Sequence, residues 1–262
     1  MFKLMWVSLL LLISTSAWAE TIQVYFYHHQ PPFLIGDEKN KQGLVYDVVS
    51  LMNKNPKPGL TFEVSSRPRK RLNEELADWI SAACPAKPQG CNNSWVVFWV
   101  TPMWGWGEKA DQRYLWVDLF PDKDVIVSPI SNKVEYKDAS SLAGKTFAGL
   151  LGHKYPPDIE GLINEGKLKR DDGADEEAVM KRIALGRADV GMMQNSALEY
   201  YFAHNEKLAK LKNDVYVAPT PLHSFTLQVM IPGNRPDLQA FLKEMKQNSG
   251  WNPLFAKYDI KL

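Results

Sequence analysis

The chain has 262 residues, of which 31 are Lys or Arg and 30 are Asp or Glu, so its formal net charge is +1 at pH 7. A nearly neutral chain argues against a partner that is held by charge, such as nucleic acid or an anionic membrane. The composition, 45% hydrophobic and 23% charged, is typical of a soluble globular protein. This length allows one large domain or two medium ones.

The N-terminus has the pattern of a secretory leader. Lys3 precedes an apolar run, Leu4–Ile13, and Ala17-Trp18-Ala19 stands ahead of Glu20, which predicts a signal peptide over residues 1–19. The apolar run is shorter than the roughly 20 residues that span a bilayer, although a retained anchor is the alternative. Cleavage would leave 262 − 19 = 243 residues with 30 basic and 30 acidic side chains. We therefore expect a periplasmic protein.

Cys84 and Cys91 are the only cysteines. In an exported chain an even count predicts one disulfide, here around a turn-rich segment, residues 85–90. Two free thiols or two metal ligands are the alternatives, but two ligands alone do not make a zinc site.

The first part of the chain alternates strand and helix patterns. A continuous apolar run such as residues 94–100 is typical of a strand covered on both faces, and the alternation predicts parallel pairing. We expect strands at Thr21–Tyr27, Leu60–Ser65 and Ser94–Val100, and helices at Gly43–Lys54 and from Pro68 towards Ala83.

A second alternating series follows an apolar run bounded by Pro121 and Pro129. We expect strands at Asp124–Ser128, Lys145–Leu151, Ala188–Met193, Val215–Ala218 and Ser224–Ile231, and helices at Pro156–Gly166, Asp175–Gly186, Ser196–Asn205, Pro236–Asn248 and Gly250–Tyr258.

Two segments are suited to holding an anion. Arg113 stands ahead of the strand-like run after residue 121, and its guanidinium is a planar fork of donors that matches a carboxylate. The strand Lys145–Leu151 ends in a Gly-His-Lys turn that opens a helix, where backbone N–H groups and the helix dipole favour an anion. The alternatives are a surface Arg113 paired with Asp111 or Asp118, and a solvated helix start.

With the segment Gly186–Gln194, these motifs resemble bacterial extracellular solute-binding protein family 3, the amino-acid type, over nearly the whole mature chain. The resemblance implies a type II periplasmic binding protein, with two α/β lobes joined by two hinge strands near Asp124–Ser131 and Val217–Phe225. Residues 20–126 and 222–262 would form lobe 1, and residues 127–221 lobe 2. Such hinges close the lobes around a ligand.

The resemblance also implies ligand contacts. Arg113 would grip a ligand carboxylate, and the turn of Gly152, His153, Lys154 and Tyr155 would hold an anion. Its side chains are bulkier than the small hydroxyl residues of the family, so a ligand of different size and shape is implied.

Gln194 stands where the family has the aspartate that takes the ligand's α-ammonium. A neutral amide can bond an ammonium but cannot neutralise it. Glu108 could supply the missing charge, or it could pair with Arg113.

The first strand-to-helix turn carries His28, His29, Gln30 and Phe33, where the family lays an aromatic ring against the ligand. Gln30 stands at the place of the family's tyrosine. The adjacent histidines could ligate metal, but no third ligand stands at a recognisable spacing.

Trp104 and Trp106 flank Gly105 and would suit an apolar or cationic part of a ligand, or would lie in the core. The basic run Arg67–Arg71 is expected to be a solvated helix start, with Arg71 as a lesser candidate for the cleft.

We expect no catalysis, because neither a G-x-S-x-G elbow nor an H-E-x-x-H motif occurs. The sequence predicts a monomer without cofactor or metal that binds a small anionic or zwitterionic solute by hinge closure. Delivery to an ABC-type transporter would make an inner-membrane permease its partner. A sensor module that reports to a receptor, or an enzyme on the same fold, are the alternatives.

Overall fold

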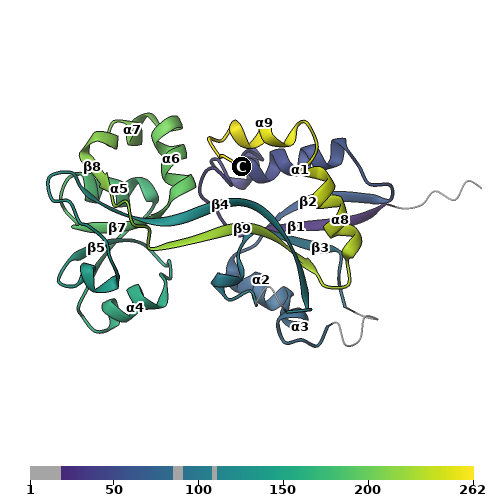
Figure 1. Cartoon of the computed structure of the whole chain (residues 1–262), viewed down its shortest axis with the longest axis horizontal. Coiled ribbons are helices and arrows are strands. Elements are labelled where there is room, and N and C mark those ends of the chain that lie inside the picture. The colour runs from purple at the N-terminus through teal and green to yellow at the C-terminus, as the bar shows by residue number, and fades with distance from the viewer. Residues whose placement is uncertain (1–18, 85–90, 108–110) are drawn as a thin grey trace, which may run out of the picture.

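The computed structural model describes residues 19–84, 91–107 and 111–262. Figure 1 shows two groups of helices and strands, linked by β4 (Tyr114–Pro129) and β9 (His223–Pro232), which run side by side from one group to the other. The prediction of two α/β lobes joined by two strands is confirmed. The leader predicted over residues 1–19 lies, except for Ala19, outside the described residues.

One sheet of nine strands passes through both lobes, because β4 and β9 belong to each, in the order β2-β1-β3-β9-β4-β7-β5-β6, with β8 paired to β4. In the first lobe β1 pairs in parallel with β2 and β3, as the alternation predicted. The crossing strands β4 and β9 are antiparallel to each other. The other strands are β1 (Glu20–Phe26), β2 (Leu60–Ser66), β3 (Trp95–Val100), β5 (Thr146–Leu150), β6 (Lys169–Gly173), β7 (Val190–Gln194) and β8 (Val215–Val217).

Helices cover both faces of the first lobe's sheet, with α1, α8 and α9 on one face and α2 and α3 on the other (Figure 1). The helices are α1 (Leu44–Lys54), α2 (Arg69–Glu75), α3 (Ala77–Ile80), α4 (Pro157–Asn164), α5 (Glu176–Ala184), α6 (Asn195–His204), α7 (Glu206–Ala209), α8 (Pro236–Met245) and α9 (Trp251–Ala256). Short 3-10 turns lie at Glu38–Asn40, Pro102–Trp104, Ala139–Leu142 and Lys212–Asp214.

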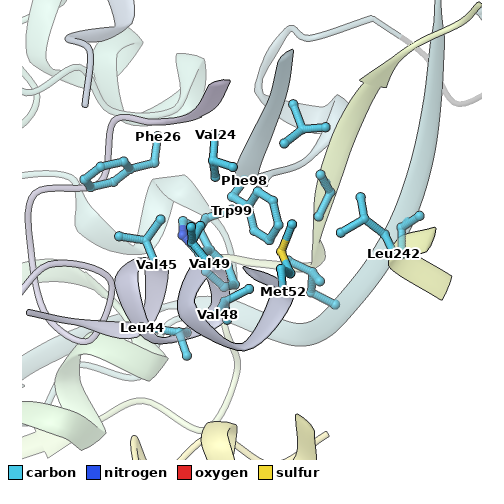
Figure 2. Close-up of a cluster of buried hydrophobic side chains, with 14 of the residues drawn as sticks. Val24, Phe26, Leu44, Val45, Val48, Val49, Met52, Phe98, Trp99 and Leu242 are labelled. Atoms are coloured by element: carbon cyan, nitrogen blue, oxygen red, sulfur yellow. The ribbon is translucent and has the colours of Figure 1, made fainter. Parts of the chain in front are cut away.

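The first lobe's core forms where α1 meets β1 and β3 (Figure 2). Apolar side chains recur on one side of α1, so that Val48 and Met52, one helical turn apart, are fully buried. Burial of each such side chain contributes about 1.5 to 3 kcal/mol. On β3, Phe98 and Trp99 complete this core.

The crossing strands pass from one core to the other over a few residues. On β4, Phe120 packs in the first lobe and Val125 in the second. The return lies between Leu222, just before β9, and Phe225 on β9. Val125, Ile126 and Leu222 pack with side chains of the second lobe, and the exact lobe boundaries stay a prediction.

Three elements differ from the expected ones. The strand β4 begins at Tyr114, ten residues before the expected start, and Pro121 is tolerated within it. The helix expected from Pro68 to Ala83 is divided at Leu76 into α2 and α3. The charged strand β6 escaped prediction because it lies at the edge of the sheet, where charged side chains are common.

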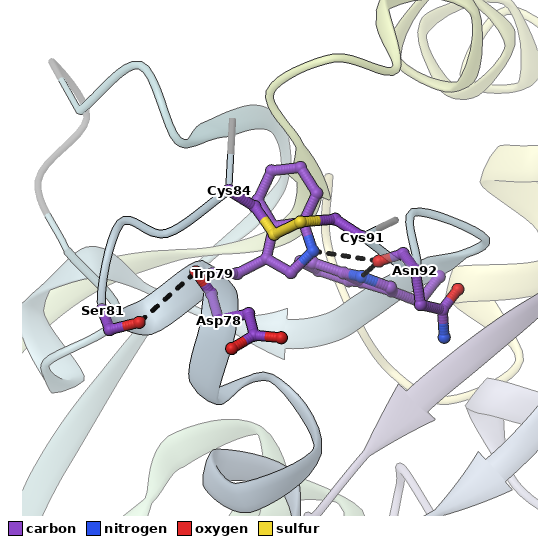
Figure 3. Close-up of a disulfide and its surroundings, with 7 residues drawn as sticks. Asp78, Trp79, Ser81, Cys84, Cys91 and Asn92 are labelled. Carbon is purple, nitrogen blue, oxygen red and sulfur yellow. Dashed lines mark hydrogen bonds between the residues drawn. A yellow bond between two sulfur atoms is a disulfide. The ribbon is translucent and has the colours of Figure 1, made fainter. Parts of the chain in front are cut away.

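The predicted disulfide is confirmed, since Cys84 and Cys91 are joined, with Cα atoms 6.3 Å apart. Figure 3 shows its surroundings. The indole N–H groups of Trp79 and Trp95 both donate to the carbonyl of Asn92, each at 2.9 Å. These two bonds hold the chain next to Cys91 against the indoles of Trp79 on α3 and Trp95 on β3.

Candidate functional site

The two lobes contact each other through polar side chains beside the crossing strands. Gln30, just after β1, donates from Nε2 to Oε1 of Gln194, at the end of β7, over 3.3 Å. Gln194 in turn donates from Nε2 to Oδ2 of Asp122 on β4, over 2.9 Å. We call Gln30, Asp122, Asp124 and Gln194 the junction cluster.

Strand register gathers this cluster. Asp122 and Asp124 are two residues apart on β4, so their side chains point to the same face of the sheet. Asp124 stands opposite Gln194 on β7 and opposite His223 on β9. Side chains at opposed positions of neighbouring strands share a face. Asp122, Asp124, Gln194 and His223 therefore lie on one face of the sheet, where the lobes meet.

Backbone N–H groups on β4 and at the start of α6 bond the carboxylate of Asp122. Its Oδ1 accepts from the backbone N–H groups of Lys123, at 2.8 Å, and Ser196, at 3.2 Å. Only 8% of Asp122 is exposed. Burial raises the pKa of its carboxyl, against the lowering by these N–H groups and by Gln194.

Asp124 is buried to a similar extent but has no such support. Burial, and secondly the charge of Asp122, raise the pKa of Asp124 to about 7. Within the described residues no hydrogen-bond donor reaches its carboxylate. A buried carboxylate without a donor is costly in free energy, and groups perturbed in this way gather at functional sites.

On the first lobe's side Tyr27, Trp104, Trp106 and Arg69 pack together, and we call them the aromatic wall. The guanidinium of Arg69, at the start of α2, lies 3.6 Å from the ring centroid of Trp106 and 5.5 Å from that of Tyr27. Arg69 also donates to the carbonyl of Trp104 at 3.2 Å. Trp106 is 2% exposed and donates its indole N–H to the Tyr27 hydroxyl at 3.3 Å. The buried Trp106 therefore contacts both Arg69 and Tyr27 and fixes their positions.

His28 joins this wall to the core. Its ring centroid lies 4.4 Å from that of Tyr27 and 5.4 Å from that of Trp104. Burial lowers the pKa of His28 to about 3, so the imidazole is neutral at pH 7. A hydrogen bond with the backbone of Trp99 holds the ring, while Nε2 has no partner among the described atoms. Trp99 has φ of 65° at a register shift of β3, an irregularity that is common beside functional sites.

The other predicted residues of the first turn have different surroundings. His29 is half-exposed, with Nε2 2.9 Å from the Ser66 hydroxyl. Phe33, expected against the ligand, is fully buried between His28 and Trp99. Its ring packs against His28 and Trp99 and exposes no surface that a solute could contact.

The structure does not bring Arg113 to the junction cluster. Its Nε donates to Asp111 at 2.7 Å, its Nη2 contacts the same carboxylate, and its Nη1 donates to the carbonyls of Trp79 and Ile80. Nine residues of extended chain separate Arg113 from Asp122, up to about 30 Å at 3.3 Å per residue. Arg113 is thus paired as the alternative interpretation had it. Glu108 lies outside the described residues.

The turn after β5 has its own acceptors. The N–H of Tyr155 donates to Glu160 at 2.7 Å, and the Tyr155 hydroxyl accepts from the N–H of Leu150 at 2.8 Å. Asp158 and Glu160 both lie in the first turn of α4. Negative side chains already occupy the positive end of this helix, which disfavours a ligand anion there.

The rest of this turn lies at the rim of the second lobe. Arg170 donates to the carbonyl of His153 at 2.9 Å, which fixes the turn, and Gly152 adopts a φ of 77°. Lys154 is exposed.

Sequence reasoning missed Asp122, Asp124 and Arg69. The signal was present for the two acids, because Asp is depleted in strands and two of them at alternate positions leave one face polar. Arg69 was named only within the basic run. Arg71, the lesser candidate there, pairs with Glu75 and is 65% exposed.

Two surface hollows lie away from the junction. One, of about 270 Å³, is lined by Tyr114, Leu115, Trp116, Asp118, Gln228 and Gln239. The other, of about 440 Å³, lies between residues 55–58 and 240–248. In the described part of the chain no group of His, Cys, Asp or Glu could hold a metal ion, and no helix there has the length and apolarity to cross a membrane.

Neither a protein-family model nor a curated protein matches this sequence. Among solved structures, a putative L-cystine ABC transporter protein from Listeria monocytogenes superposes with a TM-score of 0.62 at 15% identity, covering 93% of this chain and 99% of that one. The chain has the fold of the type II periplasmic binding proteins. A mutant of ArgBP from T. maritima gives 0.59 at 18% identity, covering 91% and 95%.

A third similar structure is the ancestral amino-acid-binding protein AncCDT-1, a precursor of cyclohexadienyl dehydratase, with a TM-score of 0.56 at 19% identity, covering 91% of this chain and 95% of that one. Identities this low establish the type II fold alone.

Proposed function

We propose that this protein is an extracytoplasmic solute-binding protein of family 3, which binds one small, amino-acid-like solute between its lobes. The observation that carries the proposal is the hydrogen bond between Gln30 and Gln194 across the lobes, beside the buried Asp122 and Asp124. Polar groups of both lobes converge there, and Phe225, opposite Asp122 on β9, packs against the ring of Trp104. A few convergent polar groups with aromatic neighbours are typical of small-molecule sites.

The crossing strands give the proposal a mechanism. β4 and β9 carry the chain between the lobes, so a small change in their backbone angles would swing one lobe against the other. A solute that contacts Gln30 on one lobe and Gln194 on the other interacts more favourably with the closed arrangement. It therefore shifts the population of lobes towards closure.

Delivery to an ABC transporter is the proposed purpose of this binding. Similar folds include the substrate-binding protein of an amino acid ABC transporter, at 16% identity. The leader pattern of residues 1–19 agrees with the export that such a role requires. A sensor that passes the bound state to a membrane receptor would use the same site.

Calorimetry with matched variants tests the proposal. Gln30→Ala removes a hydrogen-bonding group that we place in the site, and affinity for a solute that binds the wild type is expected to fall by about 0.5 to 1.5 kcal/mol. Gln239→Ala is the control, because Gln239 bonds the carbonyl of Trp116 beside a hollow of the first lobe. Equal affinity of Gln30→Ala and wild type, with a loss in Gln239→Ala, would move the site to that hollow.

An enzyme on the same fold is a second candidate, because a buried carboxyl such as Asp124, with a pKa of about 7, would suit a general acid or base. The binding function predicts that a bound solute is recovered chemically unchanged after prolonged incubation. Mass spectrometry of the released solute decides between the two.

A further inference from the structure

Two buried carboxylates lie together at the junction, and no Lys or Arg in the described part of the chain pairs with them. Asp122 and Asp124 are 8% and 7% exposed, and they share one face of β4. Within the described chain, no Lys or Arg charge is among the causes that shift the pKa of either carboxyl. The charge that shifts the pKa of Asp124 there is the like charge of Asp122. Lys123, between them, alternates to the other face of the strand.

The two acids are supported unequally. Asp122 accepts from two backbone N–H groups and from Gln194, so α6 and the end of β7 fix its position. The carboxylate of Asp124 accepts from no described donor. An unpaired buried charge is normally removed by pairing or by protonation. Asp124 is therefore the group with open acceptor capacity.

We propose that Asp124, with Asp122 beside it, receives a cationic group of the solute, a protonated amine or a guanidinium. This inference rests on the proposed function. It excludes a purely anionic solute and places the cationic group of the solute at the crossing strands. Such a group would give the two buried carboxylates a counter-charge that no described Lys or Arg supplies.

The contacts and the register of Gln194 agree with a cationic group at Asp124. Both polar atoms of its amide are committed, Oε1 to Gln30 and Nε2 to Asp122. Asp124 stands directly opposite Gln194 on the neighbouring strand, where Cβ atoms lie about 4.5 to 5.5 Å apart. The negative charge that residue 194 lacks is thus present one strand away, and Gln194 positions Asp122.

Aromatic rings extend the same chemistry. Phe225 stands opposite Asp122 on β9, and the ring of Trp104 packs edge-on against it with centroids 5.0 Å apart. Aromatic faces attract ammonium and guanidinium groups. The surroundings of the two acids therefore favour an organic cation over a metal ion, which would call for more oxygen ligands.

The test is isothermal titration calorimetry at pH 8 with five probes: L-arginine, L-lysine, putrescine, L-glutamine and succinate. At least one of the three cationic probes is expected to bind, and Asp124→Asn is expected to weaken its binding at least tenfold. Asp118→Asn is the control, because Asp118 also lies on β4 but contacts Gln228, away from the junction cluster. The affinity of this variant for the cationic probe should stay within threefold of wild type.

A rescue variant separates a charge effect from a structural one. Asp124→Asn combined with Gln194→Asp returns one carboxylate to the opposed position, so affinity for the cationic probe should recover at least threefold over the single variant. The single variant is expected to be folded, because it removes an unpaired buried charge, and its melting temperature at pH 8 should be no lower than that of wild type.

Binding of any probe with equal affinity to wild type and Asp124→Asn would overturn the inference and leave the proposed function standing. Succinate as the tightest probe, strengthened by Asp124→Asn, would also overturn it. If no probe binds, the inference fails. If native mass spectrometry of protein purified without denaturation also detects no bound solute, the proposed function fails with it.

Discussion

Asp124→Asn should change how stability depends on pH in the absence of solute. The pKa of Asp124 is raised from 3.8 to about 7, because burial and the neighbouring Asp122 disfavour the charged form. Between these values the folded state holds a proton that the unfolded state has lost. Stability of the wild type therefore falls as pH rises through this window, by 1.36 kcal/mol per pH unit from this group.

The magnitude follows from the width of the window. Over about 3 pH units the unfavourable contribution reaches about 4 kcal/mol at most, and it is complete above pH 7. The asparagine carries no charge at any pH. The variant should therefore gain up to about 4 kcal/mol relative to wild type between pH 4 and pH 8. His223, opposite Asp124 on β9, and Asp122 are the titratable groups on the same face, and they are retained in both proteins.

Urea denaturation of both proteins at intervals between pH 4 and pH 8 measures this difference. His28→Gln provides a control of opposite sign. Burial lowers the pKa of His28 from 6.5 to about 3, so the stability of the neutral ring is full above pH 6.5 and is lost as pH falls. A stability difference between Asp124→Asn and wild type that does not change with pH would refute the assignment of Asp124 as a buried, unpaired carboxylate.

Three further changes concern residues outside the junction cluster. Arg113→Ala should leave solute affinity unchanged while lowering stability by about 1 to 2 kcal/mol, because Asp111 and two carbonyls lose a charged donor; a large loss of affinity in calorimetry would return Arg113 to the site. Replacing Cys84 and Cys91 by serine should cost about 2 to 3 kcal/mol in urea denaturation without weakening binding, and alkylation of both cysteines in unreduced wild type would contradict the bridge. Phe33→Ala should cost about 3 to 5 kcal/mol, as expected for a large core residue; a loss below about 1 kcal/mol would place its ring at the surface instead.

Much of the fold could be predicted because its signals are local. The apolar face of α1 has the helical period, and the uninterrupted apolar run of β3 marks a strand covered on both sides. Cys84 and Cys91 are a few residues apart, so their pairing needed no knowledge of the fold. The length of β4 could not be predicted in the same way, since its pairing with β9 joins residues that are 99 to 118 positions apart.

The site could be predicted only in part, because it depends on distant contacts. Gln30 and Gln194 were singled out from their motifs, but they are 164 residues apart, and only the folded chain brings them together. Arg113 matched its motif, yet the local carboxylate of Asp111 holds its guanidinium. Two Asp at alternate positions of β4 are a local signal for a polar face, but the register that sets Asp124 opposite Gln194 is known only from the folded chain.

A crystal structure of the protein with its tightest-binding solute tests the central claim most directly. We predict that the solute lies between the lobes, with polar atoms within hydrogen-bonding distance of Gln30 or Gln194 and a cationic group against Asp124. A solute bound instead in the hollow lined by Tyr114 and Gln239, with the junction cluster untouched, would contradict it.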